Sequence, residues 1–134
     1  MQARCQCGSL TATIVDDAEA MTVLCHCFDC QRRSGSPFGV MAYFPTEAVT
    51  IAGQATRYVR QTDAGNSYSN GFCTTCGSTL FSTPGKYPEM IGIALGALGN
   101  PAFPPPARSV YEQSRHPWVM LPKTMPRHSR GRDS

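Results

Sequence analysis

Seven cysteines, gathered in three short clusters, limit how this chain can fold. The clusters are a C-x-C at Cys5 and Cys7, a C-x-C-x-x-C at Cys25, Cys27 and Cys30, and a C-x-x-C at Cys73 and Cys76. The two pairs can complete one four-thiolate site, whereas the triplet leaves one position of a tetrahedral ion open. We therefore expect one closed, structural metal site and one open site at which chemistry can take place.

The length and the cysteine count favour a single domain in a reducing compartment. The chain has 134 residues, which suits one domain and is short for two. Its beginning lacks the apolar stretch of a secretory signal, and no apolar run approaches the about 18 residues of a membrane span. We predict a cytoplasmic protein with no membrane partner, where cysteine clusters bind metal more often than they form disulfides.

The net charge of +3 comes from the last residues of the chain. Basic and acidic side chains balance up to residue 121, whereas residues 122–134 carry an excess of Lys and Arg. A short end that contains Pro, Ser and Arg is typical of a flexible tail. We predict one domain over residues 1–121, a basic, flexible tail over residues 122–134, and no nucleic-acid partner, which would need a basic stripe on the folded body.

Alternating polar and apolar residues predict a mainly β fold. Prolines and glycines interrupt the chain too often for long helices, although a short helix near residues 45–49 fits the pattern. Exposed strand edges are compatible with a monomer or a homodimer. The expected strands span residues 9–15, 21–24, 38–44, 55–61, 66–72, 90–95 and 109–112.

The spacing of the four outer cysteines suits a zinc ion. Side chains at i and i+2 of a strand lie on one face, so a C-x-C aims two sulfurs at one point. A C-x-x-C turn wraps two sulfurs around an ion, and Gly8 and Gly77 permit a tight backbone beside each pair. We predict that a structural zinc is held by Cys5, Cys7, Cys73 and Cys76.

The triplet predicts a second zinc ion with a free position. Cys25, Cys27 and Cys30 can cap one face of the ion and leave room for water or an incoming thiol. Arg32 and Arg33 follow directly; their charge favours thiolate over thiol, and a guanidinium is well shaped for a carboxylate. Gly35 has no side chain, so a ligand can approach the backbone there closely. We expect a substrate to contact Arg32, Arg33, Ser34 and Gly35.

Three other interpretations of the triplet stay open. His26 can complete a closed site as a fourth ligand, although neighbouring strand residues point to opposite faces. Cys27 and Cys30 can form a redox-active pair, although the chain lacks a thioredoxin-like βαβ pattern. Arg32 and Arg33 can be plain surface charges.

The cysteine motifs resemble those of the glutathione-dependent formaldehyde-activating enzyme family, which shares a fold with Mss4-like zinc proteins. One departure is Ser109-Val110-Tyr111, where members of the family often have a histidine. All seven cysteines fall on motif positions, and the resemblance runs from about residue 3 to residue 120. The matching segments are Cys5-Gln6-Cys7-Gly8-Ser9-Leu10, the stretch from Cys25 to Phe38, Gly71 to Leu80, Leu95 to Pro101, and Ser114-Arg115-His116-Pro117-Trp118.

The resemblance implies a β-tent of antiparallel sheets around two zinc ions, over the domain at residues 1–121. It implies a carbon–sulfur lyase that joins a small thiol, glutathione, to formaldehyde or another aldehyde, as an S-hydroxymethylglutathione synthase does. The catalytic zinc would be held by Cys25, Cys27 and Cys30. The alternative is a non-catalytic zinc protein that binds a thiol or a protein partner. The lyase and the non-catalytic protein differ in whether adduct formation is faster than the spontaneous reaction.

Overall fold

The computed structural model describes residues 1–134 and consists mainly of β-strands with one short α-helix. The helix α1 spans Phe28–Ser34, and three 3-10 helices are η1 (Thr46–Ala48), η2 (Leu95–Leu98) and η3 (Glu112–Ser114). The strands are β1 (Gln2–Arg4), β2 (Thr11–Ile14), β3 (Met21–Cys25), β4 (Gly39–Pro45), β5 (Val49–Ala52), β6 (Ala55–Gln61), β7 (Ser67–Cys73), β8 (Thr79–Pro84), β9 (Met90–Ala94) and β10 (Arg108–Val110).

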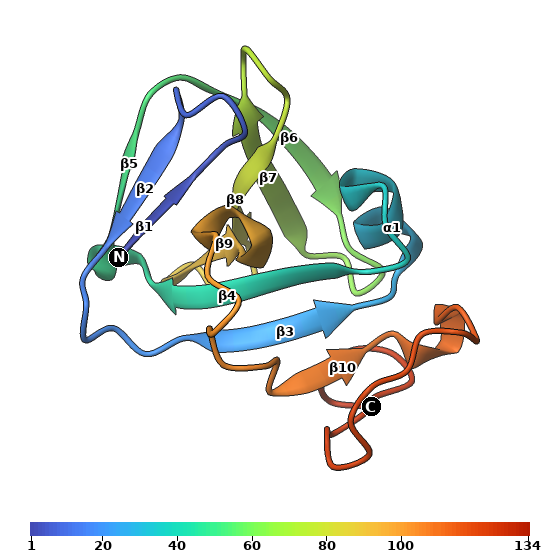
Figure 1. Ribbon diagram of the computed structural model, residues 1–134. Helices are drawn as coiled ribbons and strands as arrows, with labels where there is room; N and C mark the ends of the chain where they lie inside the picture. Colours follow the sequence, from blue (N-terminus) through green and yellow to red (C-terminus); the bar gives the residue numbers. More distant parts are fainter.

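The strands form two sheets that lean against each other like the sides of a tent (Figure 1). The smaller sheet has the order β1-β2-β5, and the larger has the order β10-β3-β4-β9-β8-β7-β6. Neighbouring strands are antiparallel except β10, which pairs with β3 in parallel. The predicted mainly β tent of antiparallel sheets is therefore confirmed, with one parallel pair added.

The core lies between the two sheets, on one face of the larger sheet. In β4, Ala42 and Phe44 are fully buried and pair with Ile93 and Ile91 of β9. From the smaller sheet, Ile14 and its neighbours complete the same apolar cluster. Side chains alternate between the faces of a strand, so Met41 and Tyr43 point to the opposite face. The larger sheet thus has one face in the core and one face free to build a site.

The segment 122–134 runs beside β10 (Figure 1). Ser109 forms a bridge with Arg127, and the amide of Tyr111 donates a hydrogen bond of 2.8 Å to the carbonyl of Arg130. The edge of β10 is therefore covered by the end of the chain, which leaves β6 as the uncovered edge of the larger sheet. Flexibility of this segment in solution stays a prediction. No helix has the length and apolar character needed to cross a membrane.

Candidate functional site

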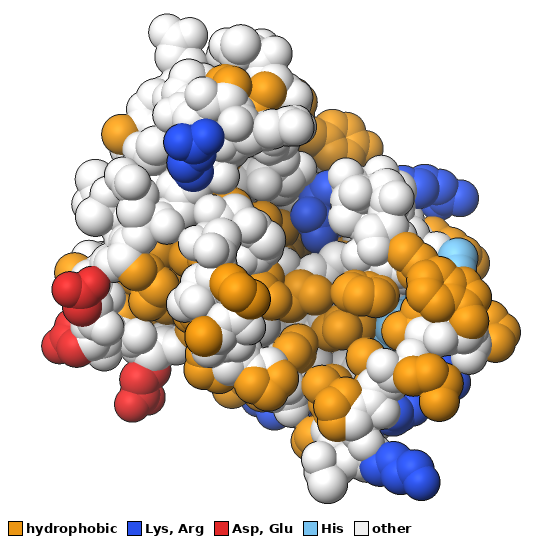
Figure 2. Space-filling view, in the orientation of Figure 1, with side chains coloured by type: hydrophobic (Ala, Val, Ile, Leu, Met, Phe, Trp, Pro, Cys, Tyr) orange, Lys and Arg blue, Asp and Glu red, His pale blue; other side chains and the backbone are white.

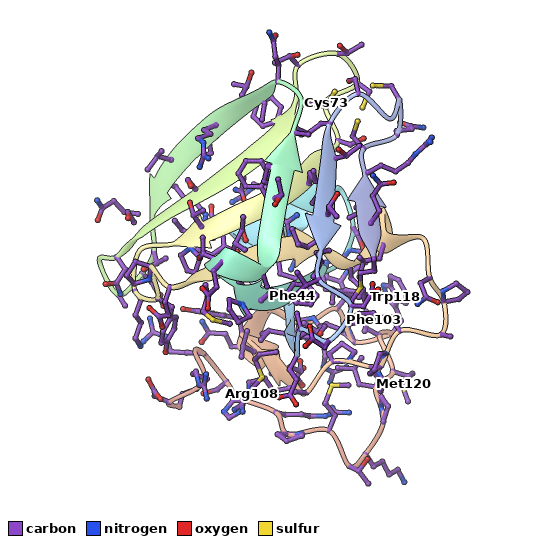
Figure 3. All side chains as sticks on the ribbon, turned by 90° about the vertical axis from the view of Figure 1, so that its left-hand side faces the viewer. Phe44, Cys73, Phe103, Arg108, Trp118 and Met120 are labelled. Carbon is purple, nitrogen blue, oxygen red and sulfur yellow. The ribbon has the colours of Figure 1, made fainter.

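The four outer cysteines meet where the hairpin loops of the two sheets come together. Their sulfur atoms all lie within 4.8 Å of one another. The sulfur of Cys7 lies 3.6 Å from those of Cys5 and Cys73, close to the about 3.8 Å that separates thiolates around a tetrahedral zinc at about 2.3 Å. Figure 3 shows Cys73 at the end of the molecule where sulfur atoms gather. These residues therefore fit a four-coordinate metal ion.

Local backbone geometry explains why this cluster forms. Gly8 and Gly77 both adopt positive φ, 83° and 78°, in turns that return the chain past each cysteine pair. Cys5 and Cys73 are 2% and 1% exposed and belong to the core between the sheets. Hydrogen bonding from Ser78 lowers the pKa of Cys76 to about 5, and hydrogen bonding from Ser9 lowers the pKa of Cys73 to about 7. The surroundings of these two cysteines thus favour the thiolate, the form that binds metal.

The central triplet is built by the end of β3 and the start of α1. Cys25 ends β3, and Cys27 is the N-cap of α1, where its sulfur accepts a 3.3 Å hydrogen bond from the amide of Cys30. An N-cap and the residue three positions later lie side by side on the first helical turn. The three sulfurs lie within 4.8 Å of one another, and no fourth His, Cys, Asp or Glu joins them. The triplet therefore fits a metal ion with one free position.

Hydrogen bonds among the three thiols of the triplet favour the loss of one proton. Hydrogen bonds from Cys25 and then Cys30 hold the pKa of Cys27 well below its ordinary value. The same contact with Cys27 raises the pKa of Cys25. Arg60 adds a favourable charge to Cys27. Cys27 is therefore the first of the three to be a thiolate.

His26 does not join the triplet. Its side chain is fully buried, and Nε2 lies 2.9 Å from Ser109 Oγ and 3.0 Å from a Glu112 oxygen. Its backbone carbonyl accepts hydrogen bonds from Gln31 (2.8 Å) and Ser114 (2.7 Å). Burial lowers the pKa of His26, so the ring is neutral at pH 7. His26 anchors the backbone between Cys25 and Cys27, and the interpretation as a fourth ligand is wrong.

The triplet lies in the wall of a cavity of about 710 Å³, on the face of the larger sheet that the core leaves free. This volume is within the range of small-molecule sites. Tyr43 and Tyr68 also line it, joined by a 2.7 Å hydrogen bond, and Tyr68 donates on to Ser82 at 2.9 Å. Burial raises the pKa of both tyrosines, which stay neutral hydroxyls. The cavity combines thiols, phenols and cations.

Both predicted arginines line this cavity, but in different ways. Arg33 is half-buried and lies against Gly39 of β4, where an added Cβ would overlap its guanidinium and come within 3.3 Å of the Cβ of Cys30. Arg32 is exposed, with its guanidinium 5.6 Å from the ring centre of Phe28. In Figure 2, Lys and Arg side chains flank α1, and the visible acidic side chains lie at the opposite edge of the molecule.

The other two predicted substrate residues lie outside the cavity lining. Gly35 caps α1 with φ 68°, and Ser34 donates a 3.0 Å hydrogen bond to the carbonyl of Phe38. Both residues therefore end the helix and turn the chain towards β4. Their contact with a substrate stays a prediction.

Sequence reasoning missed several cavity residues from distant parts of the chain. Arg60 of β6 lies 3.4 Å from Asp29 and 4.8 Å from the ring centre of Tyr68. Tyr111 is the one non-glycine residue with positive φ (57°), and its hydroxyl donates a 2.5 Å hydrogen bond to Asp63. No local pattern marks these residues; only the pairing of strands brings them to the triplet.

Comparison with known proteins agrees with this geometry. Residues 1–114 match the family model described as glutathione-dependent formaldehyde-activating enzyme. A crystal structure of a Rhodobacter sphaeroides protein superposes with a TM-score of 0.56 at 22% sequence identity, covering 78% of this chain and 92% of that chain. At this identity the likeness concerns the fold. No curated protein matches the chain. The family model covers most of the chain, which therefore belongs to the glutathione-dependent formaldehyde-activating enzyme family.

Proposed function

We propose that this protein is a zinc-dependent carbon–sulfur lyase that forms or cleaves the adduct between glutathione and formaldehyde or another aldehyde. The observation that carries the proposal is the triplet Cys25, Cys27 and Cys30, which has three sulfurs, a free fourth position and an adjoining cavity of about 710 Å³. The family match supports the reaction type.

The two cysteine clusters would have different tasks. Cys5, Cys7, Cys73 and Cys76 would hold a structural zinc, and the triplet would hold the catalytic one. When bound there, zinc supplies a Lewis acid that lowers the pKa of a thiol in the free position.

The cavity residues would bind and orient glutathione. Arg33 has no acidic partner within salt-bridge distance and lies next to Cys30, so its guanidinium is available to a ligand carboxylate. Arg32 adds positive charge to the same cavity, and Arg60 lies there paired with Asp29. Positive charge near the sulfurs also favours the thiolate form of the substrate.

The chemistry requires little from the protein beyond positioning. The thiolate sulfur attacks the carbonyl carbon, a carbon–sulfur bond forms, and the π electrons of the carbonyl move to its oxygen. That oxygen takes up a proton from solvent, which balances the proton that the thiol lost. Cleavage is the reverse sequence. Holding the two reactants together is the largest contribution that such a site can make.

A direct assay tests the proposal. The zinc-loaded protein is mixed with glutathione and formaldehyde, and adduct formation is followed against the spontaneous rate. We expect acceleration by the native chain and none by Cys27→Ser. A native protein that holds two zinc ions without accelerating the reaction would favour a non-catalytic thiol-binding module. A cytoplasmic location and a monomeric or homodimeric state stay predictions.

A further inference from the structure

A second cavity, of about 480 Å³, adjoins the first on the same face of the larger sheet. The two share lining residues, among them Val23, Tyr43, Tyr68 and Tyr111. The cavities are therefore parts of one cleft. The carbonyl carbon of formaldehyde bears only hydrogen, so neither formaldehyde nor its adduct needs the second part.

Strand β3 shows how the cleft is arranged. Met21, Val23 and Cys25 lie on one face of β3. Cys25 lines the first cavity, Val23 lines both, and Met21 lines only the second. Cys25 lies four residue steps along the strand from Met21, a distance of about 13 Å at about 3.3 Å per residue. A ligand bound at the triplet must extend along this strand to reach the second cavity.

The chemistry of the walls changes along the cleft. Arg32, Arg33 and Arg60 line the first cavity and not the second. Arg60 is paired with Asp29, so Arg32 and Arg33 are the two that suit the carboxylates of glutathione. Apolar and aromatic side chains, among them Met21, Met90 and Tyr87, line the second and not the first. Moving a carboxylate into such surroundings is unfavourable unless it is paired.

Charged residues are also present at the second cavity, and two of them are already paired. Lys86 lies 3.3 Å from Asp133, and Asp63 lies 3.3 Å from Arg130. Arg108 contacts only His128 among nearby titratable side chains, at 3.3 Å, and keeps its charge, whereas Glu89 and Arg132 carry charges of opposite sign. Figure 3 shows Arg108 on the side of the molecule remote from Cys73. The preference for an apolar occupant therefore rests on the apolar and aromatic side chains named above.

We propose that the second cavity binds an apolar group on the carbon side of the adduct, so that the substrates are glutathione adducts of medium-chain or arylalkyl aldehydes. This inference rests on the proposed function of the first cavity. The bond change is the one described above, between the thiolate sulfur and the carbonyl carbon, with the oxygen taking up a proton. The apolar group changes only how the adduct is held.

Unreactive thioethers test the inference without depending on catalysis. The zinc-loaded full-length chain is titrated with S-methylglutathione and S-hexylglutathione by isothermal calorimetry. We expect the hexyl compound to bind at least about tenfold more tightly, because each methylene group removed from water is worth about fourfold in affinity. Equal affinities would overturn the inference and leave the proposed function intact, whereas no binding of either thioether would count against both.

Variants that fill the second cavity with a larger side chain test whether this cavity is where the hexyl group binds. Met21→Trp and Met90→Trp should each reduce the ratio of the S-hexylglutathione affinity to the S-methylglutathione affinity to less than about threefold. The affinity for S-methylglutathione itself should stay unchanged. Met120→Trp is the control, because Met120 is 86% exposed and lines neither cavity. Circular dichroism identifies any variant that fails to fold, and the other variant then carries the test. Full hexyl preference in a folded filling variant would contradict the inference.

Discussion

The hydroxyl of Tyr111 donates a 2.5 Å hydrogen bond to Asp63 and so joins the two ends of the larger sheet. Asp63 follows β6 and Tyr111 follows β10, and these are the two edge strands of that sheet. Arg130, from the end of the chain, approaches the same carboxylate at 3.3 Å. Because Asp63 and Tyr111 line both cavities, this contact closes the curved sheet over the cleft.

Removing the hydroxyl at this contact should loosen the loop between β6 and β7. We expect Tyr111→Phe to reduce the free energy of unfolding by about 1 kcal/mol, since the bond is charge-assisted but partly exposed. Hydrogen exchange of the amides of Thr62 and Gly65 should accelerate. Tyr58→Phe is the matched control, because Tyr58 is 61% exposed and lines neither cavity. Equal exchange in the two variants would show that the contact does not close the cleft.

The approach of Arg33 to β4 depends on the missing side chain of Gly39. In Gly39→Ala, the new methyl group would occupy the space of the guanidinium and displace it from beside Cys30. We expect glutathione affinity to fall about tenfold, the loss of one charge-assisted contact of about 1.5 kcal/mol. Zinc content should stay unchanged.

Two comparisons make the Gly39 experiment specific. Gly96→Ala is the matched control, since a Cβ there meets no atom within 4 Å. Arg33→Gln should produce the same loss as Gly39→Ala, and the double variant should lose no more than either one. Additive losses would mean that Gly39 acts independently of Arg33.

His26 should position the triplet without binding metal itself. Its buried ring contacts Ser109 and Glu112, and its carbonyl accepts two hydrogen bonds. We expect His26→Ala to lower the free energy of unfolding by about 2–4 kcal/mol, because a buried, hydrogen-bonded side chain is replaced by a cavity. Zinc content should fall only at the triplet. Two fully retained zinc ions would contradict a positioning role.

The two cysteine clusters should differ in what their loss does to the fold. Cys27→Ser should lower the zinc content from two ions to one and leave the far-ultraviolet circular dichroism unchanged. Cys76→Ser should give unfolded or insoluble protein, because a closed site contributes on the order of 10 kcal/mol to folding. A chelator should likewise remove the zinc ion at Cys25, Cys27 and Cys30 without unfolding the protein. Similar behaviour of the two variants would contradict the division into an open and a closed site.

The sequence predicted which cysteines group together, because each pair or triplet has a local geometry. Each is set by a turn, by the end of a strand or by the first turn of a helix, and the glycines beside Cys7 and Cys76 mark turns with positive φ. The strand at residues 55–61 was likewise predicted with its observed bounds. Short-range periodicity suffices for such elements.

Helix α1 escaped prediction although its signals were present. Asp29 lies in its first turn, Arg32 and Arg33 in its last, and Gly35 follows as the cap. The cysteine spacing suggested a metal-binding turn, and both descriptions apply to the same residues. Strand β8 was missed because both of its faces are largely buried, so its residues do not alternate.

The cleft itself could not be predicted from the sequence. Arg60 and Tyr111 come from the two edge strands or their ends, far apart along the chain. Their meeting depends on strand order and on the curvature of the whole sheet, neither of which a local pattern encodes. The residues that shape substrate choice are therefore the ones that a single sequence reveals least.

Zinc K-edge X-ray absorption tests the central claim most directly, because it counts sulfur ligands per ion. The account predicts two zinc ions whose average lies between three and four sulfurs, since one cluster has four cysteines and the other three. Adding glutathione should raise the average to four, and Cys27→Ser should remove that response. An average of four before glutathione is added, or no change on its addition, would contradict an open thiol-binding site at Cys25, Cys27 and Cys30.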